Sequence, residues 1–241
     1  MRKIFHYECC RLLRNKFFIG LLLVLLFFGW QVLSRRTILG VSHTAPFSPW
    51  SFGDYLSRMI PLLWIGAMLF LTFFTSAAAR RAAVLTDAAP AHPRCYAMAR
   101  CAAALTGTTL LALCCLAEAA VFYWSYFRWL DWGELLLPAL VTLAPPLVFA
   151  LGSGWLAGQI RPWLVYLWMA LPLAWTALPL PKPFGIWNGH FFTEYPLTLQ
   201  ILDPAFTMPI PVLLTQCTFL SAGLTLLTCR PGKREHGKKR K

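Results

Sequence analysis

The stretch FFIGLLLVLLFFGWQVL, residues 17–33, decides the class of this chain. It contains no charged side chain, and most of its residues are large and apolar. A helix of about 20 apolar residues crosses the hydrocarbon layer of a bilayer, and it satisfies its own backbone hydrogen bonds where lipid offers none. We therefore predict a first transmembrane span over residues 17–33.

A cleaved signal peptide is the alternative for this start, because it also has a basic segment followed by an apolar one. Such a peptide ends in small residues at its cleavage site, whereas Ser34, Arg35 and Arg36 follow here. These residues favour a retained membrane anchor.

The residues before this span, 2–16, read RKIFHYECCRLLRNK. Phe5, Cys9, Leu12 and Leu13 recur at helical spacing, with basic residues between them. This pattern is typical of a helix that lies in the membrane interface.

The composition extends the membrane interpretation to the whole chain. Of the 241 residues, 58% are hydrophobic and 13% are charged, whereas a soluble domain carries about 25% charged residues. We predict an all-α integral membrane protein with six transmembrane helices, in one domain over residues 1–229 that precedes a basic disordered tail, 230–241. The five further spans are predicted at about residues 59–79, 101–127, 135–158, 163–180 and 208–228.

The charges predict the orientation. A net charge of +13 can indicate nucleic-acid binding, but no basic-aromatic module lies outside the spans. With a cytoplasmic N-terminus, 17 of the 22 Lys and Arg residues lie on the inner side of the membrane. Cytoplasmic loops are rich in Lys and Arg, so we place both termini in the cytoplasm.

Few side chains in the spans could carry chemistry. The chain has no G-x-x-x-x-G-K-[ST] loop, so it is not its own ATPase of that kind. Gly152-Ser153-Gly154 suggests a serine intramembrane protease, but none of the five His residues lies in a predicted span to act as the base. Close helix packing by small residues is the favoured interpretation of this run.

Glu118 is the one acidic residue within a predicted span. An ionisable group in lipid is costly and is therefore a functional candidate. The alternative is a structural role, in which Glu118 is neutral or reaches a polar neighbour such as Gln216. Both interpretations stay open at this point.

The inner loop 80–100 is basic and contains Pro90 and Pro93. A soluble partner could bind this loop, and short helices within it could transmit force to the spans. The alternative is a solvated loop whose arginines only set the topology.

The layout resembles the permease subunit of type-2 ATP-binding-cassette (ABC) exporters, and in its compact size a small bacterial half-permease. Leu13-Arg14-Asn15-Lys16 stands directly before the first span, and Phe149-Ala150-Leu151-Gly152 is similar to a small-residue stretch of the family. Leu202-Asp203-Pro204 is similar to the end of the family's short re-entrant outer helices, with Asp in place of the more usual Asn. Many members carry Glu and Arg-Gly after the second span, where this chain has Arg80, Arg81 and two Ala residues.

The inner loop is similar to the family's coupling-helix segment. The resemblance implies that a separate cytoplasmic ATPase, which holds ATP and Mg²⁺, docks on this loop and on the interfacial helix; this chain would bind no cofactor. The implied coupling residues are Arg80, Arg81, Asp87, Pro90, Arg94, Tyr96 and Arg100.

The resemblance further implies a second permease subunit, identical or different, in a bacterial cytoplasmic membrane. The two would export an amphipathic substrate such as a drug, a lipid or an antimicrobial peptide. The alternative is a membrane protein without transport function. An intramembrane enzyme would need Glu118, Ser153 and Gln216 to converge, and a scaffold or sensor would have only the outer segment 181–207 as its candidate.

Overall fold

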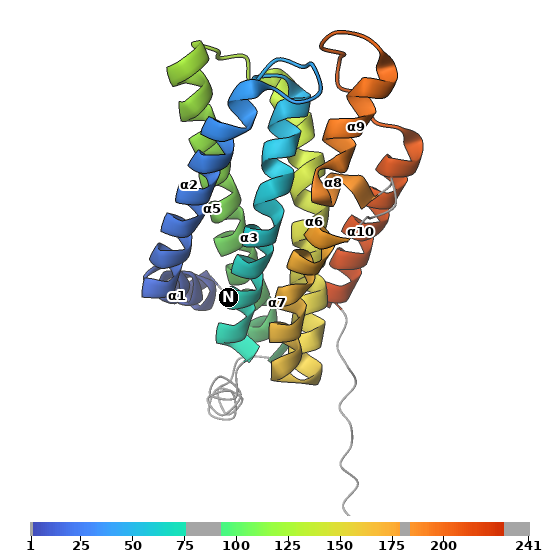
Figure 1. Cartoon of the computed structure of the whole chain (residues 1–241). Helices are drawn as coiled ribbons and strands as arrows, with labels where there is room; N and C mark the ends of the chain where they lie inside the picture. The colour runs from blue at the N-terminus through green and yellow to red at the C-terminus, as the bar shows by residue number, and fades with distance from the viewer. Residues whose placement is uncertain (1, 76–92, 179–183, 229–241) are drawn as a thin grey trace, which may run out of the picture.

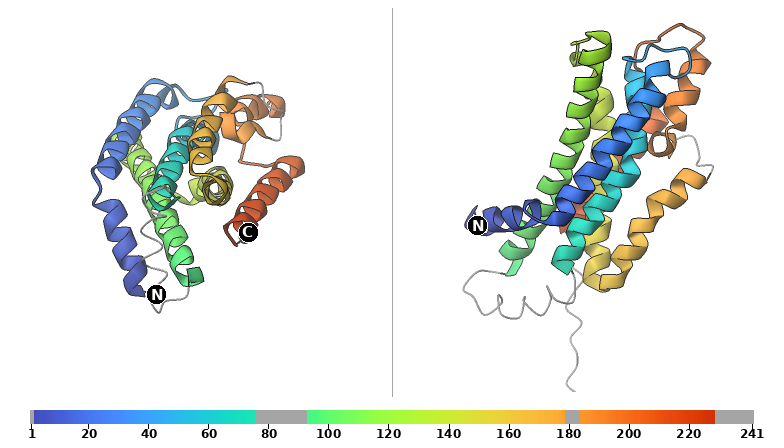
Figure 2. Two further views of the ribbon diagram at one scale, coloured as in Figure 1. Left: turned by 90° about the horizontal axis from the view of Figure 1, so that it is seen from below. Right: turned by 60° about the vertical axis from the view of Figure 1, so that its left-hand side comes forward.

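A short helix lies across one end of a helical bundle in the computed structural model, which describes residues 2–75, 93–178 and 184–228 (Figure 1). Helix α1 (Arg2–Leu13) meets helix α2 (Lys16–Arg35) at a sharp corner (Figure 2). The side chain of Asn15 caps α2 by accepting a hydrogen bond of 3.1 Å from the Phe17 amide. The helix predicted over residues 2–16 is thus present. It ends at Leu13, two residues before the Asn15 cap of the next helix.

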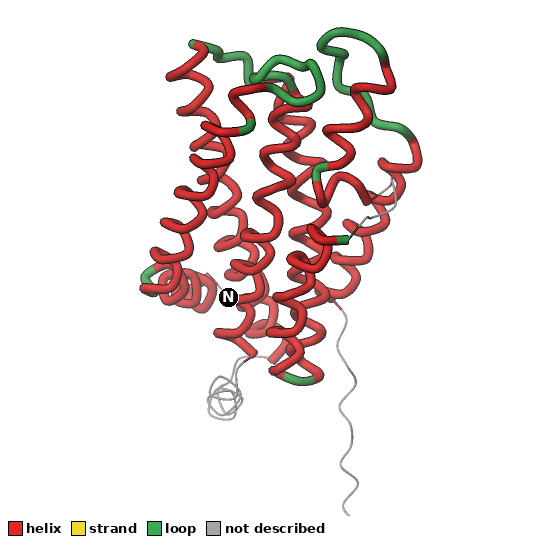
Figure 3. Tube along the Cα trace, in the orientation of Figure 1, coloured by secondary structure: helices red, strands yellow, loops and turns green. Residues whose placement is uncertain are grey.

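Five helices of the described residues are long and apolar enough to cross a membrane. Besides α2 they are α3 (Pro49–Thr75), α5 (Pro93–Phe127), α6 (Gly133–Ile160) and α10 (Ile210–Thr228). All regular structure in the described ranges is helical (Figure 3). The chain therefore has the architecture of an all-α, multi-pass membrane protein.

The span predicted at residues 163–180 corresponds to a shorter helix. Helix α7 (Pro162–Ala177) has 16 residues, which gives a length of about 24 Å, whereas the hydrocarbon layer is about 30 Å thick. Two short helices follow, α8 (Gly185–Asn188) and α9 (His190–Leu199). Six full spans and the membrane depth of α8 and α9 therefore stay predictions.

Two helices begin earlier than predicted. Helix α3 begins at Pro49 rather than at residue 59, so Asp54 and Arg58 are helical and do not lie in a loop. Helix α5 begins at Pro93 rather than at residue 101, and its 35 residues extend over about 52 Å. The predicted boundaries were wrong because each was placed where the apolar run begins. A helix satisfies its own backbone hydrogen bonds, so it can extend beyond the apolar run into a polar segment.

Helix α3 is the centre of the bundle and packs against α2, α5, α6 and α7. Its aromatic side chains Trp50, Tyr55 and Trp64 are fully buried. At the contact between α6 and α10, a methyl group on Gly152 would collide with the backbone carbonyl of Gly223. The predicted close helix packing at residues 152–154 is therefore confirmed.

The bundle has two distinct ends (Figures 1 and 2). The α1 end contains α1, the last turn of α3, the first turn of α5, the turn between α6 and α7, and the last turn of α10. The α9 end contains the loop 36–48, the loop 128–132 and α9. Basic residues of the described ranges are more numerous at the α1 end, as predicted, and its assignment to the cytoplasm stays a prediction. They are Arg2, Lys3, Arg11, Arg14, Lys16, Arg94, Arg100 and Arg161 at the α1 end, and Arg35, Arg36, Arg58 and Arg128 toward the α9 end.

Candidate functional site

The predicted coupling residues fall into two groups. Arg80, Arg81, Asp87 and Pro90 lie outside the described residues, as does the predicted disordered tail 230–241. The other three, Arg94, Tyr96 and Arg100, lie in the first two turns of α5. The described part of the predicted inner loop, residues 93–100, is thus helical and continuous with the rest of α5.

Tyr96 and Arg100 both bind Glu8, a fully buried residue of α1. The Tyr96 hydroxyl donates to Glu8 Oε1 over 3.2 Å, and Arg100 Nε lies 3.5 Å from the same oxygen. Arg11 Nη1 lies 3.4 Å from Glu8 Oε2. The Arg100 guanidinium also lies over the Tyr96 ring, 4.3 Å from its centre. We call Glu8, Arg11, Tyr96 and Arg100 the Glu8 cluster.

Helical spacing builds this cluster from both sides. Glu8 and Leu12 are one turn apart on the buried face of α1, and Tyr96 and Arg100 are one turn apart on α5. A buried carboxylate is costly unless it is paired and hydrogen-bonded, and the two arginines and the tyrosine meet that requirement. The cluster therefore attaches α1 to the part of α5 that extends toward the predicted ATPase contact.

Sequence reasoning missed Glu8. The predicted apolar face of the first helix, Phe5, Cys9, Leu12 and Leu13, is at least partly buried, which confirms that face. Glu8 lies on the same side, one turn before Leu12, and is the one acidic residue in the segment 2–16. That position was a usable signal, but its partners 88 and 92 residues away could not be inferred from spacing.

Glu118 is a partly buried residue of α5, and its side chain faces α2 and α3. The Tyr55 hydroxyl of α3 is 3.4 Å from Glu118 Oε2 and 3.1 Å from the Cys115 carbonyl oxygen. On α2, a side chain on Gly29 would collide with the Glu118 carboxylate, so this glycine makes room for it. The structure thus supplies a polar neighbour for Glu118, but it is Tyr55 and not the predicted Gln216.

The three side chains that an intramembrane enzyme would need have separate partners. Gln216 Oε1 accepts from Trp187 Nε1 over 3.0 Å. Ser153 Oγ donates to the Phe149 carbonyl and accepts from Trp168 Nε1 over 2.7 Å. No hydrogen bond within the described ranges joins Glu118, Ser153 and Gln216, so the geometry gives this alternative no support.

A second buried carboxylate, Asp54, lies toward the α9 end of the bundle. Arg58 binds both of its oxygens, with Nε 2.9 Å from Oδ2 and Nη2 3.2 Å from Oδ1. Arg36 Nε, just beyond the end of α2, lies 3.1 Å from Oδ2. We call Arg36, Asp54 and Arg58 the Asp54 cluster; it joins the end of α2 to the first turns of α3.

The segment Leu202-Asp203-Pro204 docks beside this region. Trp50 Nε1 donates to the Pro204 carbonyl over 2.7 Å, and Asp203 Oδ1 accepts from the Ala45 amide over 3.4 Å. The segment thus holds the chain between α9 and α10 against the start of α3. Whether α8 and α9 re-enter the membrane stays a prediction.

Comparison with protein-family models, curated proteins and solved structures finds no match for this chain. The geometry of the described residues and the sequence patterns are therefore the basis of the functional proposal.

Proposed function

We propose that this protein is the membrane-spanning permease subunit of an ABC transporter that exports an amphipathic substrate. A separate cytoplasmic subunit would hydrolyse ATP, and this chain would convert the movement of that subunit into movement of its helices. The proposed location is the cytoplasmic membrane of a bacterium.

The observation that carries the proposal is the Glu8 cluster. A helix lying across the bundle is attached by a buried ionic contact to the base of a helix long enough to extend beyond the membrane. Packed helices move as bodies, so a force on α1 or on the first turns of α5 would reach the full length of α5. This is the mechanical arrangement that a permease driven by a separate ATPase needs.

Two helices leave room for a second permease subunit. Most of the surface of α2 and α10 is not covered by other helices of this chain, whereas most of α3 is buried. Apolar helix faces such as these are covered by lipid or by a neighbouring subunit. The scarcity of charged side chains in the spans favours an amphipathic or lipid-like cargo over a small hydrophilic ion.

Copurification tests the class. The tagged full chain is purified from its native membrane in mild detergent, and bound proteins are identified by mass spectrometry. We expect a nucleotide-binding subunit in the complex, together with vanadate-sensitive ATP hydrolysis. A chain that copurifies with no ATP-hydrolysing protein would contradict the proposal.

A pair of substitutions then tests the role of the Glu8 cluster. Glu8→Gln removes the charge at the junction, whereas Glu134→Gln removes the same charge from the first turn of α6 near the α9 end. With the partner ATPase bound, we expect Glu8→Gln to reduce the transport produced per ATP by about tenfold and Glu134→Gln to leave it unchanged. Equal effects of the two changes would show that the Glu8 cluster has no part in coupling.

A further inference from the structure

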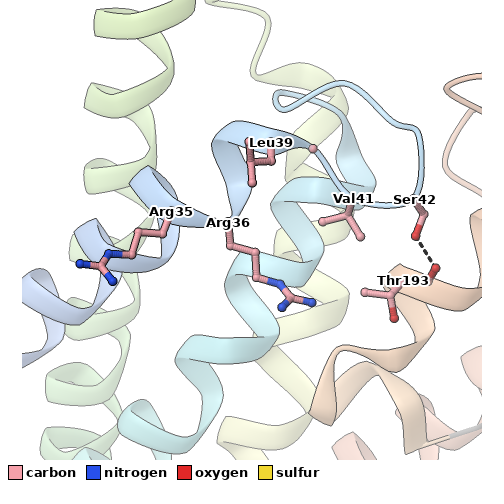
Figure 4. A pocket seen from close by; sticks show the side chains of 7 residues that line it. Arg35, Arg36, Leu39, Val41, Ser42 and Thr193 are labelled. Carbon is pink, nitrogen blue, oxygen red and sulfur yellow. Dashed lines mark hydrogen bonds between the residues drawn. The ribbon is translucent and has the colours of Figure 1, made fainter.

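A pocket of about 460 Å³ lies at the α9 end of the bundle, between the end of α2 and helix α9 (Figure 4). One side is basic, one is apolar, and hydroxyl groups complete the lining. The lining residues are Arg35, Arg36, Leu39, Gly40, Val41, Ser42 and Thr193.

The Asp54 cluster holds Arg36, one of the residues that line the pocket, in a fixed position. Arg36 uses Nε to bind the buried Asp54, and its two terminal nitrogens have no hydrogen-bond partner among the described residues. Figure 4 shows the Arg36 guanidinium directed toward the helix that carries Thr193, whereas the Arg35 side chain extends away from that helix. Arg36 therefore presents unused donors on the pocket side while its position is held from behind.

The described residues that line the pocket carry positive charge and no negative charge. Arg58 already binds both oxygens of Asp54, so Arg36 shares a carboxylate that is largely satisfied. Arg35 and Arg36 both line the pocket, and its described lining contains no carboxylate. Ser42 donates to the Thr193 backbone carbonyl, and this contact holds loop 36–48 against α9. An oxyanion with several acceptor oxygens would match the planar guanidinium donors.

The position of the pocket relative to the membrane indicates which kind of oxyanion it could bind. Helix α2 has 20 residues and a length of about 30 Å, and the charged residues Lys16 and Arg35 stand at its two ends. The pocket begins at Arg35, the last residue of α2, which places it at the level of the lipid headgroups. Leu39, at the pocket, is 81% exposed and offers apolar surface beside the basic side.

We propose that this pocket binds a phosphate group through Arg36, supplied either by the headgroup of an anionic lipid or by a free phosphate ion. Arg36 would donate from its terminal nitrogens and Arg35 would add positive charge. Thr193, whose hydroxyl already donates to the His190 carbonyl over 3.1 Å, would bound the pocket on the α9 side. The proposal is independent of the transport function, because it rests on the pocket, the Asp54 cluster and the length of α2.

Native mass spectrometry of the full chain in detergent tests the proposal by titration with phosphatidylglycerol. Diacylglycerol, which has no phosphate, is the reference lipid. We expect phosphatidylglycerol to bind and Arg36→Gln to raise its Kd about tenfold or more, because charge-assisted hydrogen bonds are lost. Arg128→Gln is the matched control, since it removes one positive charge at the same end outside the pocket, and it should change the Kd less than twofold.

Thr193→Leu is the second variant, because it fills the pocket without touching the Asp54 cluster. It should also raise the Kd about tenfold, whether or not Arg36→Gln folds well. Equal binding of the two lipids, equal effects of Arg36→Gln and Arg128→Gln, or unchanged binding by Thr193→Leu would each overturn the proposal. Competition by millimolar inorganic phosphate would identify the free ion as the ligand, and its absence would identify the lipid headgroup.

Discussion

Glu8 and Asp54 are both fully buried carboxylates, and each binds two arginines, yet they lie at opposite ends of the bundle. The contacts of Asp54 are 2.9–3.2 Å long and join residues at most 18 positions apart. Those of Glu8 are 3.2–3.5 Å long, and two of them join residues 88 and 92 positions apart. One cluster closes a local corner of the chain, and the other attaches a separate helix to the bundle.

The distances imply different strengths. Charge-assisted hydrogen bonds are strongest near 2.7–2.9 Å and weaken as the atoms separate. In the Asp54 cluster, Arg58 contacts both carboxylate oxygens, over 2.9 and 3.2 Å. Each donor of the Glu8 cluster makes a single contact, of 3.2–3.5 Å. We therefore expect the Asp54 cluster to contribute more to folding stability, and the Glu8 cluster to be the junction whose geometry can change.

The largest loss of stability should follow Asp54→Ala. This change removes three charge-assisted contacts at a fully buried position. The two arginines that remain are 50% and 31% exposed and regain water, so we expect a loss of about 2–3 kcal/mol. The free energy of unfolding is measured by denaturant titration in detergent micelles. Asp54→Asn, which keeps the size of the side chain, should lose less. A loss below about 1 kcal/mol for Asp54→Ala would contradict a stronger role for this cluster.

Glu8→Gln should have a smaller effect on stability, of about 1–2 kcal/mol, because the amide retains one acceptor oxygen for Tyr96 and Arg100. The loss should also be local. Hydrogen exchange should quicken in α1 and in the first turns of α5, with little change in the buried centre of α3. Faster exchange throughout α3 would show that Glu8 supports the whole bundle rather than a junction.

Arg11→Gln should have the smallest effect, below about 1 kcal/mol, because its side chain is 51% exposed and its contact is a pair within one helix. Arg100 makes the useful comparison, since its side chain is 13% exposed. Arg100→Gln should cost more stability than Arg11→Gln when both are measured in the same denaturant titration. The reverse order would show that the exposed arginine is the main partner of Glu8.

Hydropathy alone located most of the helices but not their ends. Five of the six predicted spans correspond to helices long enough to cross a membrane. The starts of α3 at Pro49 and of α5 at Pro93 were missed, because polar residues there were interpreted as loop. This error also hid Asp54 and Arg58, whose four-residue spacing forms an ion pair only on a helix.

The sequence by itself determined the membrane class, the packing of small residues at Gly152 and the apolar face of the first helix. These properties depend on local composition and on helical periodicity, which are visible along the chain. Only the tertiary structure decided that Glu8 meets Tyr96 and Arg100, that Arg36 meets Asp54, and that Glu118 faces Tyr55 rather than Gln216. Those contacts depend on which helix faces pack together and at what register, and a polar residue's spacing along the chain carries no information about a partner on another helix.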